Sequence, residues 1–311
     1  MGIEVIARQI AMLFIMMALG FIGVKTKFIQ VDLKDAISQV IVKFTLPLLS
    51  ITAITGQTMR PEMFRNAFFL VMIELCMIAL MYLLAMVVSK LFHLPPQTAT
   101  VHNLMSTFGN VAFLGYPLIT ALLGPEGLFY AIIYTIVNDA ILWTVGVFLI
   151  AKSSGIDNKS GVKMLINPTT ILYVVALFML ALGLKLPTVI HETFAAVGSM
   201  TTSLAMLFIG ITLGSIPLRG IYKKISIYMI VFFKMLVIPA ILVFVLSFFR
   251  PDATMMTALV LQVAMPVQTI VTVMASDAGS DYQYAAECVF ITTVASLVTL
   301  PVVYYFMQQI I

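Results

Sequence analysis

The chain alternates between long apolar runs and short polar gaps. A helix needs about 20 apolar residues to cross the hydrocarbon core of a bilayer. The runs that meet this requirement take up most of the chain and lie near residues 3–24, 36–55, 66–89, 97–123, 127–150, 166–184, 189–213, 225–248, 253–276 and 283–307. The pattern therefore predicts an all-α polytopic membrane protein with ten transmembrane helices, solvated by the lipid bilayer.

The longest polar stretch, Lys152 to Lys163, divides these spans five and five. Spans four and nine each carry an interior proline, and a repeat with an odd number of spans enters the membrane with opposite sense the second time. Inverted repeats with interrupted helices at matching positions indicate a secondary transporter. We expect a first five-helix repeat over residues 1–153, a cytoplasmic linker over 154–163 and a second repeat over 164–311.

Span four combines Gly109, Asn110, Gly115 and Pro117 within nine residues, which is poor helix chemistry at mid-membrane depth. Irregular backbone is tolerated there only where protein buries it or where it lines a wet cavity. Pro117 suits the first position of a new half-helix, because its φ is already helical and its missing N–H is not needed. Pro266 offers the same arrangement in span nine.

Two half-helix N-termini that face each other near the membrane midplane form a site for a carboxylate. Asn110, Gln268 and Thr269 would add directional hydrogen bonds to such a ligand. A simple proline kink is sufficient to explain one interrupted helix. Two interruptions at matching repeat positions favour a substrate site.

Composition narrows the function class further. Hydrophobic residues make up 62% of the 311 residues and charged ones 10%, with a mean hydropathy of +1.11, whereas about a quarter of an ordinary soluble domain is charged. The net charge of +4 is therefore no sign of nucleic-acid binding, because the basic residues mark the gaps between spans.

The basic residues also predict the orientation of the chain in the plasma (inner) membrane. The richer set of alternate gaps should be cytoplasmic, which places both termini outside. That set holds Lys25, Lys27, Lys34, Lys90, Lys152, Lys159, Lys163, Arg219, Lys223 and Lys224, against Arg60, Arg65, Lys185 and Arg250 in the other.

Charged side chains inside spans are costly and are functional candidates by default. Glu74 and Lys234 lie at nearly the repeat offset, so they either bridge each other, compensate the half-helix dipoles or are satisfied separately. Lys43, one turn before Pro47, either offers a counter-charge to a substrate carboxylate or snorkels to the interface.

Two further carboxylates are candidates for ion coupling. Asp139, which follows Asn138 in span five, and Glu287, near the start of span ten, can each exchange a proton when burial disfavours the charged form. Asp139 lies deeper and is the preferred coupling residue. His102 is placed as an interfacial residue near a helix start, with a share in proton transfer as the alternative.

Enzymatic chemistry has no support in the sequence. No Gly-Lys pair exists to form the phosphate loop of an ATPase, no protease constellation is complete, and no histidine or cysteine pair has metal-ligand spacing. We therefore expect no catalytic residues, metal or cofactor. A channel or a membrane sensor is the alternative function. Gly210 and Gly214 form a small-residue face for an internal helix contact or a dimer.

Several short motifs, in this order and spacing, resemble the bacterial auxin efflux carrier family. They are Leu46-Pro47, the stretch from Ser106 through Asn110, Gly115-Tyr116-Pro117, Gly124-Pro125-Glu126-Gly127, Tyr130, Val137-Asn138, Asn167-Pro168 and Gly210 through Gly214. The resemblance covers essentially the whole chain. It extends to the plant PIN-type auxin carriers and, in fold, to bile acid symporters.

The resemblance implies two inverted five-helix repeats in which helices four and nine cross at their breaks. Helices 1, 2, 6 and 7 would form a scaffold and helices 3–5 and 8–10 a transport domain that moves in an elevator fashion, often in a homodimer. The implied substrates are small organic anions such as malonate, malate or lactate and auxin-like acids, with a proton or sodium as coupling ion. The crossover asparagine maps onto Asn110 and the crossover prolines onto Pro117 and Pro266.

Overall fold

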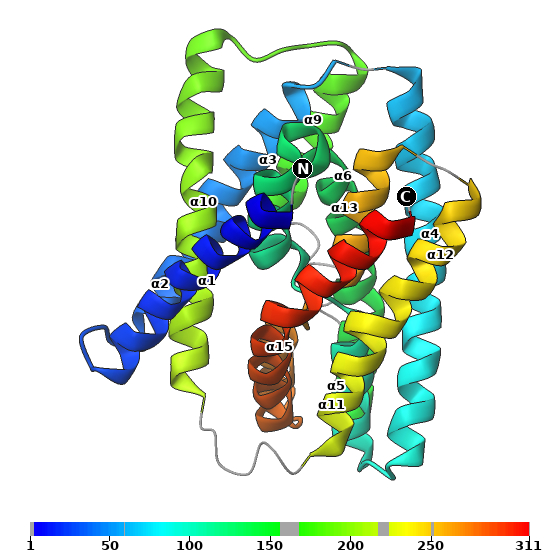
Figure 1. Ribbon diagram of the computed structural model, residues 1–311. Coiled ribbons are helices and arrows are strands. Elements are labelled where there is room, and N and C mark those ends of the chain that lie inside the picture. The colour runs from blue at the N-terminus through cyan, green and yellow to red at the C-terminus, as the bar shows by residue number, and fades with distance from the viewer. Residues whose placement is uncertain (1–2, 59, 156–167, 217–223, 250–251, 311) are drawn as a thin grey trace. The chain divides into compact units, whose positions relative to one another are not determined.

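The computed structural model describes residues 3–58, 60–155, 168–216, 224–249 and 252–310, and this part of the chain is helical apart from turns and one isolated β-bridge (Figure 1). Six helical segments are long and apolar enough to cross a membrane: Leu33–Thr55, Pro61–Leu91, Val111–Ser153, Thr188–Ser215, Ile225–Phe249 and Tyr282–Ile310. Shorter apolar helices cover Ile10–Lys25, Thr170–Ala181 and Ala253–Val263. The chain is a multi-pass membrane protein.

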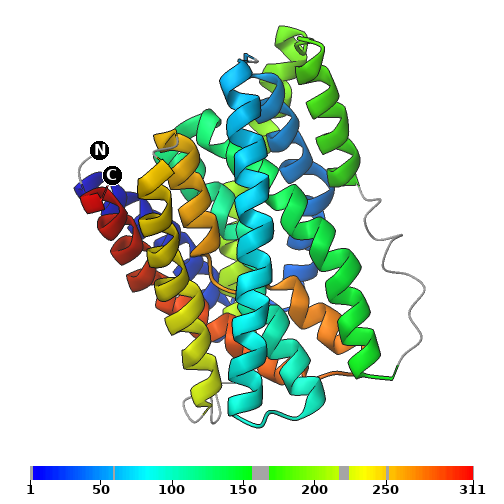
Figure 2. The same cartoon turned by 90° about the vertical axis from the view of Figure 1, so that its right-hand side faces the viewer.

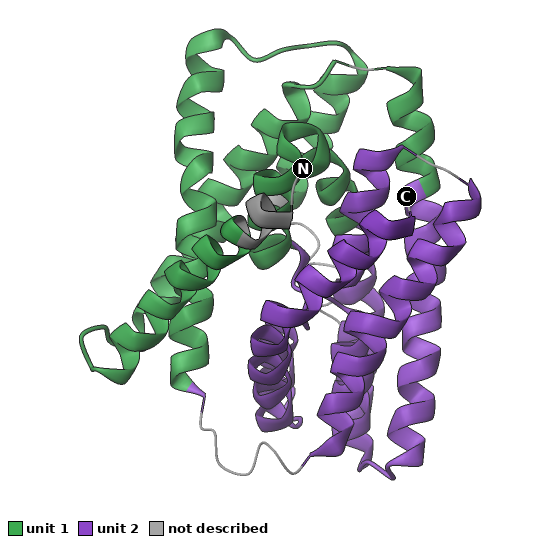
Figure 3. Cartoon of the chain, in the orientation of Figure 1, with its two compact units in different colours: residues 1–69, 112–136, 166–215 green, residues 70–111, 137–165, 216–311 purple. Residues whose placement is uncertain are grey.

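The chain forms two compact units (Figure 3). Unit 1 comprises residues 1–69, 112–136 and 166–215, and unit 2 comprises residues 70–111, 137–165 and 216–311. Each unit therefore draws on both halves of the sequence. The expected linker 154–163 lies, after residue 155, outside the described residues.

Unit 1 is built around a close pair of helices, α1 (Ile3–Lys25) and α10 (Thr188–Ser215). The other helices that lie wholly within it are α2 (Leu33–Val40), η1 (Ile41–Thr45), α3 (Leu46–Thr55) and α9 (Pro168–Ala181). A Cβ atom on Gly210 would overlap the backbone carbonyl of Met17, and one on Gly214 would lie 3.1 Å from the Cβ atom of Val24. The small-residue face of α10 therefore serves an internal contact with α1.

We expect Gly210→Ala to destabilise the protein, because the backbones of α1 and α10 must separate to admit the methyl group. Overpacking of this kind costs about 1–3 kcal/mol. The loss should appear as a lower midpoint of thermal unfolding in detergent. Gly214→Ala is the matched control, since its methyl group would meet the flexible side chain of Val24, and it should lower the midpoint less. Equal midpoints for both variants and the wild type would contradict this account.

Unit 2 contains the interrupted helices. The helices that lie wholly within it are α5 (Pro96–Thr107), η3 (Leu142–Gly146), α7 (Val147–Ser153), α11 (Ile225–Phe232), η5 (Phe233–Val237), α12 (Ile238–Phe249), α13 (Ala253–Val263), α14 (Ile270–Asp277) and α15 (Tyr282–Ile310). The long helix α4 (Pro61–Leu91), which Figure 2 shows in front, continues into this unit from residue 70. Within unit 2, α15 packs against α5, α11, α12, α13 and α14.

Three prolines in long helices follow a π-helical turn by two residues. The turns η1, η2 (Val111–Gly115) and η5 precede Pro47, Pro117 and Pro239. A proline ring clashes with the carbonyl four residues earlier in an α-helix, and in each case that residue lies at the centre of the π-turn. The widened turn thus lets the helix continue through the proline without a break.

Each apolar run of the sequence overlaps at least one helix. Spans four and five meet at Gly124, whose φ of 66° ends one helix inside α6 (Tyr116–Ile141) before Pro125 begins the next. Only glycine adopts this conformation at little cost. The inverted relation between the two halves remains a prediction.

Candidate functional site

Two helix interruptions in unit 2 cross each other. The first, Phe108–Asn110, separates α5 from η2, and the second, residues 264–269, separates α13 from α14. Gly109 and Val267 form an antiparallel β-bridge at the crossing point. Gly109 is required there, because a Cβ atom at this position would lie 3.3 Å from the Cβ atom of Met265.

The crossing satisfies the backbone groups that each interruption leaves open. The N–H of Asn110 donates to the carbonyl of Pro266 at 2.7 Å, and the N–H of Gln268 donates to the carbonyl of Phe108 at 3.1 Å. The N–H of Val267 donates to Oγ1 of Thr292 on α15 at 3.3 Å. Since lipid offers no hydrogen bonds, each interruption is stable at this depth because the other one is present.

Polar side chains converge on the crossing. Nδ2 of Asn110 donates to Oγ1 of Thr269 at 3.2 Å, and Asn110 and Gln268 are 1% and 7% exposed. The Oδ1 atom of Asn110 is buried and has no hydrogen-bond partner among the described residues. An unsatisfied buried amide of this kind is costly and is characteristic of a ligand site.

A buried lysine lies at the end of the first half-helix. Lys234 on η5 is 2% exposed, and its Nζ donates to the backbone carbonyl of Thr107, the last residue of α5, at 3.1 Å. Sδ of Met81 lies 4.0 Å from the same nitrogen. A cation at this place complements the partial negative charge at the C-terminal end of a helix. Within the described residues Lys234 forms no salt bridge with Glu74.

Two carboxylates and an amide form a second polar group in unit 2. Glu74 on α4 is fully buried, and neither of its oxygens has a well-formed hydrogen bond among the described residues. The carboxylate of Asp139 and the backbone of Asn138 nevertheless act on Glu74 electrostatically. Nδ2 of Asn138 donates to Oδ1 of Asp139 at 3.2 Å. Two carboxyl groups so placed compete for charge, because burial and repulsion both disfavour a second negative charge.

Comparison with known proteins identifies the family. The family model described as "Membrane transport protein" matches residues 5–159 and 154–304, which together cover nearly the whole chain. The chain belongs to this family. It is the auxin efflux carrier-like family that the sequence motifs indicated, and membership makes the protein a transporter, not an enzyme.

Relatives of the transporter occur in bacteria and archaea. It is 24% identical over 212 residues to the "Uncharacterized transporter YfdV" of Escherichia coli strain K12, which covers 65% of this chain and 67% of that protein. It is 25% identical over 235 residues to the "Uncharacterized transporter MJ1031" of Methanocaldococcus jannaschii, covering 74% and 75% of the two chains. An "Uncharacterized transporter" of Methanothermobacter thermautotrophicus is 26% identical over 196 residues, covering 62% and 63%.

The predicted substrate residues of the transporter fall into different units. Asn110, Pro266, Gln268 and Thr269 lie together at the crossing in unit 2, whereas Lys43, Gly115 and Pro117 belong to unit 1. Lys43 is exposed, and its Nζ donates to Oε1 of Gln39 on the same helix at 3.0 Å.

The expected role of Pro117 as the first residue of a half-helix is wrong. The second half-helix begins at Val111, directly after the interruption, and Pro117 lies inside it after the π-turn that ends at Gly115. The interruption therefore depends on Gly109 and Asn110. Pro266, in contrast, lies within its own interruption, where its carbonyl accepts the hydrogen bond from Asn110.

Other titratable residues of the transporter lie away from the crossing, at the start of α15. Oε2 of Glu287 forms an ion pair with Nζ of Lys224 at 2.6 Å. His102, expected at the interface, is 1% exposed and bonds through Nδ1 to the hydroxyl oxygen of Tyr284 at 2.8 Å. The sequence offered no signal for Tyr284, because a tyrosine in an apolar run is most simply a packing residue.

Proposed function

We propose that this protein is a secondary active transporter of small organic anions, such as malonate, malate, lactate or auxin-like acids, and that it binds them at the crossing in unit 2. One observation carries the proposal: two interrupted helices are joined by the bridge at Gly109 and Val267, beside a buried Asn110 whose Oδ1 atom lacks a partner. An interruption of two helices at one point has no packing advantage, whereas it brings polar backbone to a ligand.

The chemistry of the crossing suits a carboxylate. The first N–H groups of a helix have no partner within the helix and carry a partial positive charge, and η2 and α14 both begin at the crossing. Asn110, Gln268 and Thr269 supply amide and hydroxyl groups that fix the orientation of the anion. Lys234, at the other end of the first interruption, adds the positive charge that offsets the charge of the ligand.

The carboxyl pair of Glu74 and Asp139 suits the coupling of transport to protons. Since both groups are held in unit 2 and act on each other, one proton is shared by the pair in one state and released in another. Asn138 orients Asp139 through the hydrogen bond at 3.2 Å. Glu287, which is paired with Lys224, has a structural role at the start of α15.

Movement follows from the division into units. Both interruptions, Lys234 and the carboxyl pair belong to unit 2, so this unit carries the substrate while unit 1, with α1, α3, α9 and α10, stays fixed as the scaffold. Alternating access of the elevator type, in a homodimer of the inner membrane with both termini outside, completes the proposal.

We expect malonate to raise the midpoint of thermal unfolding of the detergent-solubilised protein, since a ligand that binds only the folded state stabilises it. Asn110→Ala should remove most of this shift, because it deletes the amide at the crossing. Asn66→Ala, which truncates an amide in unit 1 that bonds to the hydroxyl of Tyr130, is the matched control and should keep the shift.

Counterflow in proteoliposomes separates a carrier from a channel on the same fold. A carrier takes up labelled malonate faster when unlabelled malonate is present inside, and a channel does not. A panel of mono- and dicarboxylates, including lactate and malate, then defines the substrate. Failure of every carboxylate to stabilise the wild type, or an equal shift in Asn110→Ala, would overturn the binding site.

A further inference from the structure

A chain of buried polar side chains in unit 2 takes no part in the proposed binding site. His102 on α5 bonds to the hydroxyl oxygen of Tyr284 on α15 at 2.8 Å. That hydroxyl donates to Oγ of Ser226, near the start of α11, at 2.9 Å. All three side chains are at most 5% exposed. Polar groups from three helices are thus aligned where burial makes each of them costly.

The donors in this chain all point the same way. A phenol has one hydrogen, and because Tyr284 gives it to Ser226, the imidazole must donate the bond between His102 and Tyr284. A neutral imidazole carries one N–H, so Nδ1 is protonated and Nε2 is a bare acceptor. Ser106 does not satisfy it, since its hydroxyl donates to the carbonyl of His102 at 2.8 Å and lies 3.5 Å from Nε2.

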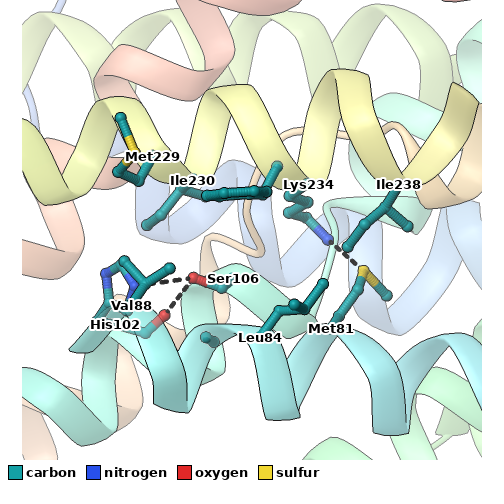
Figure 4. Close-up of a pocket in the computed structure, with 11 residues that line it drawn as sticks. Met81, Leu84, Val88, His102, Ser106, Met229, Ile230, Lys234 and Ile238 are labelled. Carbon is teal, nitrogen blue, oxygen red and sulfur yellow. Dashed lines mark hydrogen bonds between the residues drawn. The ribbon is translucent and has the colours of Figure 1, made fainter. Parts of the chain in front are cut away.

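The bare nitrogen belongs to a ring that lines a cavity shared with Lys234. The cavity measures about 20 Å³ and is otherwise apolar except for Ser106. Figure 4 shows His102 and Ser106 on one wall and Lys234 on the opposite helix. This volume holds one water, which needs two to four polar partners. Lys234 has three N–H donors and gives one to Thr107, so a donor remains for the water.

We infer that one water in this cavity links Lys234 to His102, and that His102, Tyr284 and Ser226 relay protons between Lys234 and the end of the unit where Lys224 pairs with Glu287. The inference rests on the proposed function, because it gives the positive charge at the end of α5 a route to one side of the membrane. Nζ of Lys224 lies 5.5 Å from the ring centre of Tyr284, and its side chain is 38% exposed, so the relay ends near solvent.

Each step of the relay transfers one proton and leaves the chain neutral. The water takes a proton from Lys234 and gives one to Nε2 of His102. Nδ1 then passes its proton to Tyr284, whose hydroxyl proton passes to Ser226, and Ser226 releases its own proton to solvent near Lys224. The reverse sequence returns a proton to Lys234.

The surroundings of His102 leave this route as the direct one. The titratable side chains on the elements near it are Tyr284, Glu287 and Cys288 on α15, Asp281 before α15, Lys224 before α11, Tyr228 on α11, Lys234 on η5, Lys152 on α7, Asp277 on α14, and Glu74, Tyr82 and Lys90 on α4. Lys152 and Asp277 are exposed, and Asp281 accepts from Thr98 and from the N–H of Tyr284. Tyr284 is the group bonded to the ring at Nδ1.

Nitrogen NMR of the protein labelled with ¹⁵N-histidine tests the donor direction without any substrate. The chain has 3 histidines, and His102→Gln assigns the signal of interest. We expect His102 to be neutral at pH 7 with the proton on Nδ1, and to change to the Nε2–H form in Tyr284→Phe. A proton on Nε2 or a doubly protonated ring in the wild type would overturn the inference.

Transport assays test the relay itself. In proteoliposomes, Tyr284→Phe should slow malonate uptake driven by a pH gradient by at least about tenfold, the lower range for loss of a proton-transfer group. Malonate counterflow should persist, because exchange moves no net proton. Tyr304→Phe, which removes another buried hydroxyl from α15, is the control and should match the wild type.

The outcomes separate the two proposals. Equal pH-driven uptake by Tyr284→Phe and the wild type would overturn the relay and leave the anion transporter intact. Absence of malonate counterflow in the wild type would count against the proposed substrate, and the histidine NMR would still decide the inference.

Discussion

Lys234→Met is expected to leave the protein folded and to reduce malonate transport about a hundredfold, the typical cost of removing one charge-stabilising donor from a preorganised site. Methionine fills nearly the same volume without the ammonium group. The carbonyl of Thr107 then lacks its partner, a loss of about 1–3 kcal/mol, but the cost of burying a charge disappears as well. The midpoint of thermal unfolding should therefore change little while initial rates of malonate counterflow fall.

Lys90→Met is the matched control, since Lys90 is exposed in the last turn of α4. It should transport at the wild-type rate. A Lys234→Met variant that transports normally would show that the charge at the end of α5 is dispensable, and one that does not fold would assign the residue a structural role.

Asp139→Asn should abolish the response of malonate uptake to a pH gradient and leave malonate binding in place. The amide keeps the shape of the carboxylate but cannot share a proton with Glu74. With one proton per anion, each unit of pH gradient supports about tenfold accumulation, or 1.4 kcal/mol. Accumulation of labelled malonate against imposed pH gradients measures the effect directly.

Glu74→Gln should give the same phenotype, because both groups are needed for the repulsion that makes the pair hold one proton. Asp277→Asn, a substitution of an exposed carboxylate on α14, is the control. Unchanged accumulation by Asp139→Asn would rule out this residue as the coupling group, and dependence on a sodium gradient would identify the other candidate ion.

The sequence predicted the apolar runs and the two interrupted helices because both are local properties. Length and hydropathy identify a span, and Gly109-Asn110 and Pro266 disrupt a helix in any context. The error at Pro117 is also local in origin. The π-turn from Val111 to Gly115 absorbs the proline, and a turn of this kind has no simple sequence signature.

The partners of the buried charges were less accessible to sequence reasoning. Lys234 had three open interpretations, and its bond to the carbonyl of Thr107 joins residues far apart in the chain. The repeat offset suggested a pair with Glu74, whereas the described residues place Glu74 beside Asp139. Burial of His102 escaped prediction for the same reason, since Tyr284 and Ser226 come from the other half of the sequence.

The bridge between Gly109 and Val267 has a consequence for biogenesis. Its two strands are made far apart in time, since ribosomes add about 5–20 residues per second and the second strand follows the first by more than half the chain. For roughly ten to thirty seconds the first interruption is in the membrane without the backbone partners at Pro266 and Phe108 that pair the two strands. A nascent chain halted before Val267 should therefore be a preferred target of membrane proteases and insertion chaperones, which recognise exposed polar backbone in lipid.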